Sequence, residues 1–149
     1  MANTVHLISK GYLNPNKIAD IIENVAEKLN FNFFKTYNSK FDIIDINLIE
    51  KNGSEGFLET SISCYSDYNN TFNQLYNISN YGLMVSINYS YNNTLLIPFL
   101  IEMLEELPEL LVYNEEVPDG IGSYIFNKDH LKNFSGTDSY TFLNKVPKN

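Results

Sequence analysis

The most regular pattern of apolar and polar residues covers positions 14–29, and it predicts an amphipathic helix. Asn14 is a residue type that caps helix N-termini, and Pro15 suits the first helical position because no backbone donor is needed there. Charged side chains occupy the opposite side, so one face is expected to pack on the core. The apolar residues at helical spacing are Ile18, Ile21, Ile22, Val25 and Leu29.

Strict alternation of apolar and polar residues predicts strands, and the clearest example is residues 83–91. Residues 57–65 alternate in a similar way, and we expect Leu58, Ile62 and Cys64 to face the core. Shorter apolar segments predict further strands at residues 5–8, 31–37, 110–113 and 124–126.

The segment 41–50 is less regular, because its alternation changes phase near Ile44. A β-bulge, which inserts one extra residue into a strand, would account for that change. The dipeptide Asn52-Gly53 follows, and it is typical of a tight hairpin turn. We therefore expect a bulged strand that pairs with the next strand through a hairpin.

Two further helices are expected, one beginning at Asp67 and one beginning at Asn93 or Thr94. The latter is expected to end before Pro108, because proline cannot continue a helix interior. Apolar residues cover most of its circumference, which predicts a largely buried helix.

This order of elements predicts an α+β fold. Consecutive strands joined by short turns favour an antiparallel sheet with helices segregated to one face. We expect residues 1–149 to form a single domain, a two-layer sandwich with about three helices on one face of a mainly antiparallel sheet. Residues 135–149 are expected to form a weakly structured tail.

The charge of the chain is unevenly distributed. The formal net charge is −8, and no lysine, arginine or histidine occurs between Lys51 and Lys128. A dense negative surface attracts basic proteins and repels nucleic acid and anionic lipid, so neither nucleic acid nor a membrane is an expected partner. All strongly basic residues are lysines, which leaves no planar arginine fork for phosphate. The carboxylates of this interval are Glu55, Glu59, Asp67, Glu102, Glu105, Glu106, Glu109, Glu115, Glu116 and Asp119.

Four glutamates of the expected third helix form an acidic stripe, because spacings of i, i+3, i+4 and i+7 lie on one helix face. Like charges at this spacing cost about 0.2–0.5 kcal/mol per pair, and acids near a helix C-terminus oppose its dipole by about 0.3–1 kcal/mol each. Together these effects destabilise the helix by about 1–3 kcal/mol. No lysine lies close enough in the sequence to offset this cost. The stripe is either the solvated edge of a buried helix or a recognition surface for a basic partner. Its residues are Glu102, Glu105, Glu106 and Glu109.

Further acids follow soon after the acidic stripe and could extend the same surface. They are Glu115, Glu116 and Asp119, with Tyr113 and Tyr124 close to them in the sequence. Aromatic side chains supply much of the binding energy of protein interfaces, so the two tyrosines are candidate anchors. The predicted partner-binding residues are therefore the acidic stripe together with these five.

No residue is predicted to be catalytic, and neither a metal nor a cofactor is expected. His6 and His130 lie far apart and belong to no zinc-binding spacing. Cys64 is the single cysteine, and the sequence shows neither a base nor an activating group for its thiol. The acids of the segment 41–50 do not follow the spacing of an EF-hand calcium loop.

Small size, acidic charge and the lack of a catalytic motif are typical of proteins that inhibit a basic partner by stoichiometric binding. An immunity protein that neutralises a basic toxin fits this description, as does a phage-type anti-defence protein that blocks a nucleic-acid-handling enzyme. Two alternatives are a small enzyme with a carboxylate acid–base site and a subunit of a larger assembly. The N-terminus lacks the charged start and apolar run of a secretory signal, so we expect a cytoplasmic location.

Overall fold

The computed structural model describes residues 2–9, 13–51, 57–63, 83–90, 95–114, 124–135 and 138–147. Within them, the strands are β1 (Ala2–Ser9), β2 (Phe31–Asn38), β3 (Ile43–Glu50), β4 (Phe57–Ser63), β5 (Leu83–Ser90), β6 (Leu111–Asn114) and β7 (Tyr124–Phe126). The helices of the same residues are α1 (Pro15–Lys28), α3 (Leu96–Glu106), α4 (Lys128–Leu131) and α5 (Ser139–Leu143).

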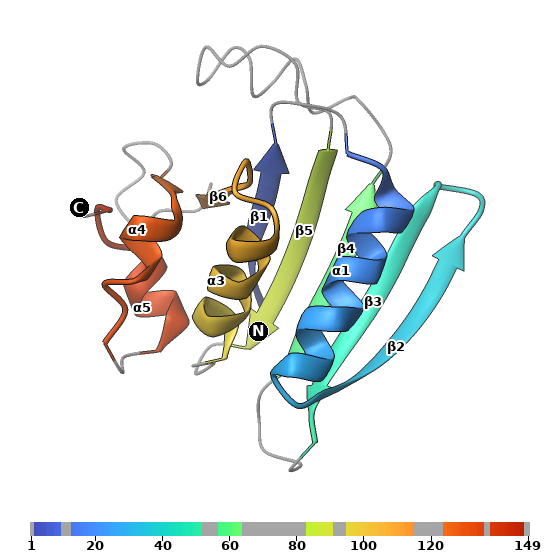
Figure 1. Ribbon diagram of the computed structural model, residues 1–149, viewed down its shortest axis with the longest axis horizontal. Coiled ribbons are helices and arrows are strands. Elements are labelled where there is room, and N and C mark those ends of the chain that lie inside the picture. The colour runs from blue at the N-terminus through green and yellow to red at the C-terminus, as the bar shows by residue number, and fades with distance from the viewer. Residues whose placement is uncertain are drawn as a thin grey trace.

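These strands form one antiparallel sheet in the order β2-β3-β4-β5-β1-β6-β7. Helices α1 and α3 lie side by side on one face of the sheet, whereas α4 and α5 lie at its β6–β7 end (Figure 1). The predicted α+β class is therefore confirmed. Along the described residues, the elements follow the order β1-α1-β2-β3-β4-β5-α3-β6-β7-α4-α5. No helix in the described ranges has the length and apolar content needed to span a membrane.

Helix α1 forms where the sequence predicts it, and its first turn follows the expected chemistry. The Asn14 side chain accepts a hydrogen bond of 2.9 Å from the backbone N–H of Asn16, and Pro15 stands near the start of the helix. One face is buried against the sheet, as the apolar spacing predicts. Its buried residues are Pro15, Ile18, Ala19, Ile22, Val25 and Ala26.

Helix α3 is largely buried, as its apolar circumference predicts. It ends at Glu106, before Pro108, and Leu95 stands at its N-cap without a polar side chain. The predicted cap residues, Asn93 and Thr94, lie outside the described residues. The buried residues of α3 are Leu96, Ile97, Phe99, Leu100, Met103 and Leu104.

The two faces of the sheet differ in chemistry because its strands alternate as predicted. On the face that α1 and α3 cover, Leu58 and Ile62 of β4 and Val85 and Ile87 of β5 are buried. The positions between them, such as Ser61, lie on the opposite face and are mostly polar. We call this opposite face the rear face.

The predicted bulge near Ile44 is wrong. Strand β3 pairs without interruption with β2 on one side and with β4 on the other. Ile44, Ile46 and Leu48 alternate regularly into the core. Phe41 and Ile43, which suggested the change of phase, do not belong to this alternation. Phe41 is exposed in the turn between β2 and β3, and Ile43 lies on the rear face.

The C-terminal segment differs from the expected tail over residues 135–149, because it contains α5. The Asp138 carboxylate caps this helix by accepting a hydrogen bond of 2.8 Å from the Thr141 N–H. Leu143 is buried, and its carbonyl accepts a hydrogen bond of 2.7 Å from Asn114 Nδ2. A helix this short is stabilised by tertiary contacts rather than by its own sequence, which is why periodicity does not reveal it.

Three other predictions concern residues that the structure does not describe. They are the turn at Asn52-Gly53, the helix beginning at Asp67 and the inward orientation of Cys64. They stay predictions, although the antiparallel pairing of β3 with β4 is the pairing that such a turn would produce.

Asn14→Ala is expected to lower the free energy of unfolding by about 1 kcal/mol, because the N–H of Asn16 loses its side-chain acceptor. Asn14→Asp should retain the cap and keep the stability near that of the wild type. Urea unfolding followed by circular dichroism measures both variants. Equal stability of Asn14→Ala and the wild type would contradict the assigned cap.

Candidate functional site

The acidic stripe runs along α3 and into the turn that follows it. Glu102, Glu105 and Glu106 belong to the helix, and Glu109 lies beyond its end. Glu102 is half-buried, whereas the other three side chains are exposed. The apolar residues between them are buried, so the packing of α3 fixes where these carboxylates stand.

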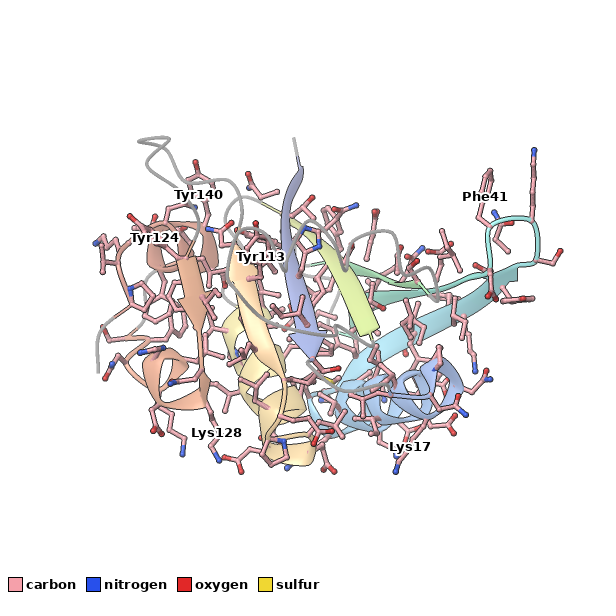
Figure 2. The ribbon with its side chains drawn as sticks, turned by 90° about the horizontal axis from the view of Figure 1, so that it is seen from above. Lys17, Phe41, Tyr113, Tyr124, Lys128 and Tyr140 are labelled. Atoms are coloured by element: carbon pink, nitrogen blue, oxygen red, sulfur yellow. The ribbon has the colours of Figure 1, made fainter. Side chains whose placement is uncertain are left out.

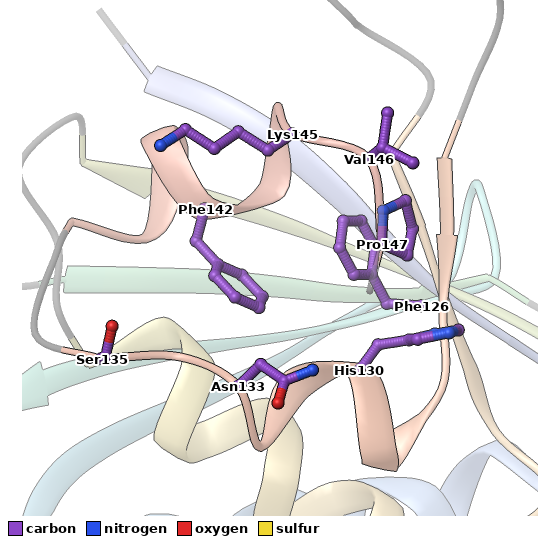
Figure 3. Close-up of a pocket in the computed structure, with 8 residues that line it drawn as sticks. All are labelled: Phe126, His130, Asn133, Ser135, Phe142, Lys145, Val146 and Pro147. Carbon is purple, nitrogen blue, oxygen red and sulfur yellow. The ribbon is translucent and has the colours of Figure 1, made fainter. Parts of the chain in front are cut away.

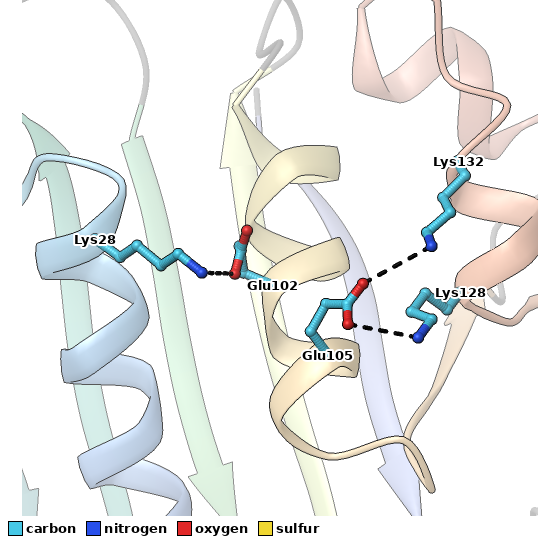
Figure 4. Close-up of polar contacts among 5 residues, drawn as sticks. All are labelled: Lys28, Glu102, Glu105, Lys128 and Lys132. Atoms are coloured by element: carbon cyan, nitrogen blue, oxygen red, sulfur yellow. Dashed lines mark hydrogen bonds and ion pairs between the residues drawn. The ribbon is translucent and has the colours of Figure 1, made fainter.

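Glu102 is paired with a lysine of α1. Its Oε2 accepts a hydrogen bond of 2.7 Å from Lys28 Nζ (Figure 4). This hydrogen bond and the attraction of the same carboxylate raise the pKa of Lys28 above its ordinary value of 10.5. The contact joins the C-terminal end of α1 to the middle of α3.

Glu105 faces two lysines from the C-terminal part of the chain. One carboxylate oxygen is 3.5 Å from Lys128 Nζ, and the other is 3.8 Å from Lys132 Nζ (Figure 4). Lys128 is the first residue of α4 and Lys132 directly follows that helix, so one carboxylate links α3 to α4. Exposed ion pairs of this kind typically contribute about 0.2–1 kcal/mol.

Lysines that are distant in the sequence therefore relieve part of the repulsion expected within the acidic stripe. Lys28 and Glu102, for example, are 74 residues apart. Glu106 and Glu109 differ, because both are exposed and neither forms an ion pair with a described residue. Glu106 acts on Lys28 only at longer range, where its charge adds a smaller contribution to the raised pKa of that lysine. They stand at the C-terminal end of α3, where unpaired helix carbonyls add negative potential. We call Glu106 and Glu109 the free acidic end.

The two candidate tyrosine anchors are not exposed beside the free acidic end. Tyr113 in β6, labelled in Figure 2, is only 2% exposed. Its ring centroid lies 5.9 Å from that of His6 on the rear face. Tyr124 in β7 is half-buried and packs against the core. The remaining candidates, Glu115, Glu116 and Asp119, lie outside the described residues.

A row of polar side chains crosses the rear face, and the sequence pattern does not reveal it. His6 Nδ1 lies 3.0 Å from Ser86 Oγ across the β1–β5 pair. Ser61 Oγ donates a hydrogen bond of 2.6 Å to Asp45 Oδ1 across the β3–β4 pair. The two serines are direct cross-strand partners. Alternation identifies the face of each residue, but only the tertiary register brings these four into one row.

This row contains a histidine beside a serine, yet its surroundings do not suit nucleophilic catalysis. Strands β1, β4 and β5 are interior strands, so their backbone N–H groups donate hydrogen bonds to the neighbouring strands. A serine nucleophile also needs donors that stabilise an oxyanion. The row is better explained as cross-strand hydrogen bonds that stabilise the sheet.

The carboxylates around β3 do not converge. Asp42 accepts a hydrogen bond of 2.9 Å from the Tyr37 hydroxyl in the β2–β3 turn region. Asp45 lies on the rear face with Ser61, whereas Glu50 occupies the opposite side of the strand. In the described part of the chain, no three His, Cys, Asp or Glu side chains are grouped in a way that could hold a metal ion.

A hollow of about 260 Å³ lies among α4, α5 and the segment after α5 (Figure 3). Phe126, Phe142 and Pro147 supply apolar walls, and His130 stands at its margin. His130 has a structural role, because its Nδ1 accepts a hydrogen bond of 3.0 Å from the Asn127 N–H and completes the cap of α4. The volume is below the roughly 300–1,000 Å³ of typical small-molecule sites.

Comparison of the sequence with models of protein families and with curated proteins finds no match. Within the acidic stripe, Glu106 and Glu109 are the two carboxylates that form no ion pair with a described residue.

Because Glu105 forms ion pairs and Glu109 belongs to the free acidic end, substitution of the two glutamates should affect stability differently. Glu105→Gln removes the carboxylate beside Lys128 and Lys132, so the free energy of unfolding should fall by up to about 1 kcal/mol. Glu109→Gln removes an acid near a helix C-terminus and should leave the stability unchanged or raise it by about 0.3 kcal/mol. Urea unfolding at low ionic strength measures both. Equal effects of the two substitutions on stability would argue against this distinction between ion-paired and unpaired glutamates.

The raised pKa of Lys28 predicts a contribution to stability that depends on pH. Such a contribution is fully present below the ordinary value of 10.5 and is lost as the pH rises through the folded-state pKa. The wild type should therefore have a higher Tm than Lys28→Gln at neutral pH, and the difference should shrink above pH 10.5. Thermal unfolding as a function of pH measures this. A Tm difference that stays constant across the range would rule out the assigned ion pair as its source.

Proposed function

We propose that the protein is a binding protein that inhibits a basic partner. The partner is a toxin, if the protein is an immunity protein, or a nucleic-acid-handling enzyme, if it is a phage-type anti-defence protein. The observation that carries this proposal is the free acidic end, where Glu106 and Glu109 are exposed and paired with no described lysine. The net charge of −8 supports it, because long-range attraction favours a basic partner.

The free acidic end suits a positively charged groove that normally holds phosphate. Its two carboxylates and the neighbouring helix carbonyls present negative charge from a fixed position, because α3 is held by its buried side chains. Such charge raises the rate of association with a basic surface and disfavours acidic partners. The carboxylates would bind the cations of the groove and so block access of its substrate.

The internal ion pairs reduce the set of glutamates that we propose to contact the partner. Glu102 and Glu105 already have lysine partners, so binding through them would require those contacts to break. Tyr113 is buried, so we assign it no direct contact with the partner. The surface is proposed to begin at the free acidic end and to include Glu115, Glu116 and Asp119. Tyr124 is half-buried and pairs with the far end of β6, so we assign it no direct contact either. A cytoplasmic partner is part of the same proposal.

A subunit of a larger assembly is the second candidate. The observation that favours it is the exposed sheet edge at β2, where Phe34 is 61% exposed. A carboxylate acid–base enzyme is less favoured, because Asp45 and Glu50 lie on opposite sides of β3 and do not form a pair.

Capture of partners from a lysate of the source cells at low salt tests the proposed inhibitor function. The wild type should retain a basic protein, identified by mass spectrometry, and release it at high salt. Glu106→Gln/Glu109→Gln should bind the same protein at least about tenfold more weakly, because the free acidic end is lost.

The matched control is Asp20→Asn/Glu27→Gln, which removes the same charge from exposed positions of α1. It should retain the partner as the wild type does. Equal retention by the wild type and the Glu106/Glu109 variant would contradict the proposal. Equal loss in both double variants would show that net charge, rather than the free acidic end, decides binding.

A further inference from the structure

Strand β2 forms one edge of the sheet, so one side of its backbone pairs with no described strand. From residue 32 to its end, the strand is exposed apart from Phe33, which is half-buried. Figures 1 and 2 show β2 and the turn at Phe41 at the opposite end of the molecule from α4 and α5. A long exposed edge with aromatic side chains is suited to the addition of another strand.

The hydrogen-bond pattern identifies which residues of β2 present backbone groups to this edge. The Lys51 N–H donates a hydrogen bond of 3.2 Å to the Asn30 carbonyl, so this pair is a hydrogen-bonded pair in the β2–β3 register. Bonded and non-bonded pairs alternate along antiparallel strands. Phe34, four residues after Asn30, therefore directs its backbone groups to β3. Phe33 and Lys35 direct theirs to the free edge.

The edge segment lacks the acidic residues that make two copies of this chain repel each other elsewhere. Residues 31–41 contain two lysines, Lys35 and Lys40, and no aspartate or glutamate, whereas the whole chain has a net charge of −8. Two carboxylates from outside this segment contact it: Glu23 lies 3.8 Å from Lys35, and Asp42 accepts a hydrogen bond from the Tyr37 hydroxyl. Approach along β2 therefore avoids the concentrated acidic charge of the rest of the chain. The repulsion to avoid is that between the two Lys35 side chains, because like charges directly opposite each other destabilise a strand pair.

We propose that two copies of this chain pair in antiparallel orientation through β2, with a twofold axis at Phe34. In this register, Phe33 of each copy forms a hydrogen-bonded pair with Lys35 of the other copy. The two Phe34 side chains face each other at a non-bonded position, where Cα atoms are about 4.5 Å apart and side chains lie closest. Each Lys35 lies opposite a phenylalanine, and the two cations are kept apart.

Neighbouring registers are less favourable. An axis at Lys35 places the two lysines face to face. An axis at Phe33 places Lys35 opposite Phe31, which is only 2% exposed and cannot offer its backbone to another strand. With the twofold axis at Thr36, the two Phe34 side chains no longer lie opposite each other. The register centred on Phe34 combines accessible backbone groups with an aromatic pair.

The contact is small, so the dimer is weak and forms at high protein concentration. Two chains of net charge −8 repel each other, and salt screens that repulsion. Self-association through β2 should therefore strengthen as salt is raised. Binding of a basic partner by the free acidic end should weaken under the same change, so the two interactions are distinguishable.

Sedimentation velocity of the full chain over a wide range of concentration tests the proposal. The wild type should shift from monomer to dimer. Lys35→Pro should weaken the dimer at least about tenfold, because it removes an N–H that faces the edge and spares the bonds to β3. Lys35→Gln is the matched control, since it loses the same charge and the same 3.8 Å ion pair with Glu23 but keeps the N–H. It should dimerise as the wild type does.

A wild type that stays monomeric at every concentration would overturn the proposal, and so would a dimer that Lys35→Pro leaves unchanged. Equal weakening by Lys35→Pro and Lys35→Gln would also overturn it, because charge rather than the backbone edge would then hold the dimer. Circular dichroism establishes that each variant is folded. If Lys35→Pro does not fold, Phe34→Lys takes its place, because it sets two cations face to face and should abolish the dimer. Phe34→Tyr, its control, keeps the aromatic pair and should preserve the dimer.

Discussion

Burial of α3 against the sheet is the constraint on which the charged surface depends. Phe99, Leu100 and Met103 are fully buried, so the helix cannot rotate to present a different side to solvent. Its exposed side lies between α1 and α4, and the glutamates there meet lysines from both neighbours (Figure 4). Glu106 and Glu109 make no such contact with described residues. Packing of apolar side chains thus decides which carboxylates are available to a partner.

The helices and strands could largely be predicted because each depends on residues that are close together in the chain. The spacing in α1 and the alternation in β5 are examples. The lysine partners of the acidic stripe could not be predicted, since Lys28 and Lys132 approach α3 only when the tertiary fold is complete. The same reason applies to the contact of His6 with Ser86 and to the burial of Tyr113, which require β1 to pair with both β5 and β6. Sequence spacing identifies a charged face, but it does not show which charges are already neutralised.

Two surfaces at different places on the fold have opposite chemistry. The free acidic end presents charge and little apolar area, which suits fast, salt-sensitive association with a basic protein. The β2 edge presents backbone groups and aromatic side chains, which suits strand addition that salt does not weaken. Both surfaces follow from the same sheet, since α3 lies on its helix-covered face and β2 forms its outer edge.

The most direct test of the account is a double-mutant cycle on the free energy of unfolding, which combines Glu105→Gln with Lys128→Gln/Lys132→Gln. At low salt, a favourable coupling of about 0.2–1 kcal/mol is expected, and it should diminish at high salt. That result would show that the stripe is divided between internal ion pairs and a free acidic end. A coupling of zero would contradict the account, because Glu105 would then be as available to a partner as Glu106.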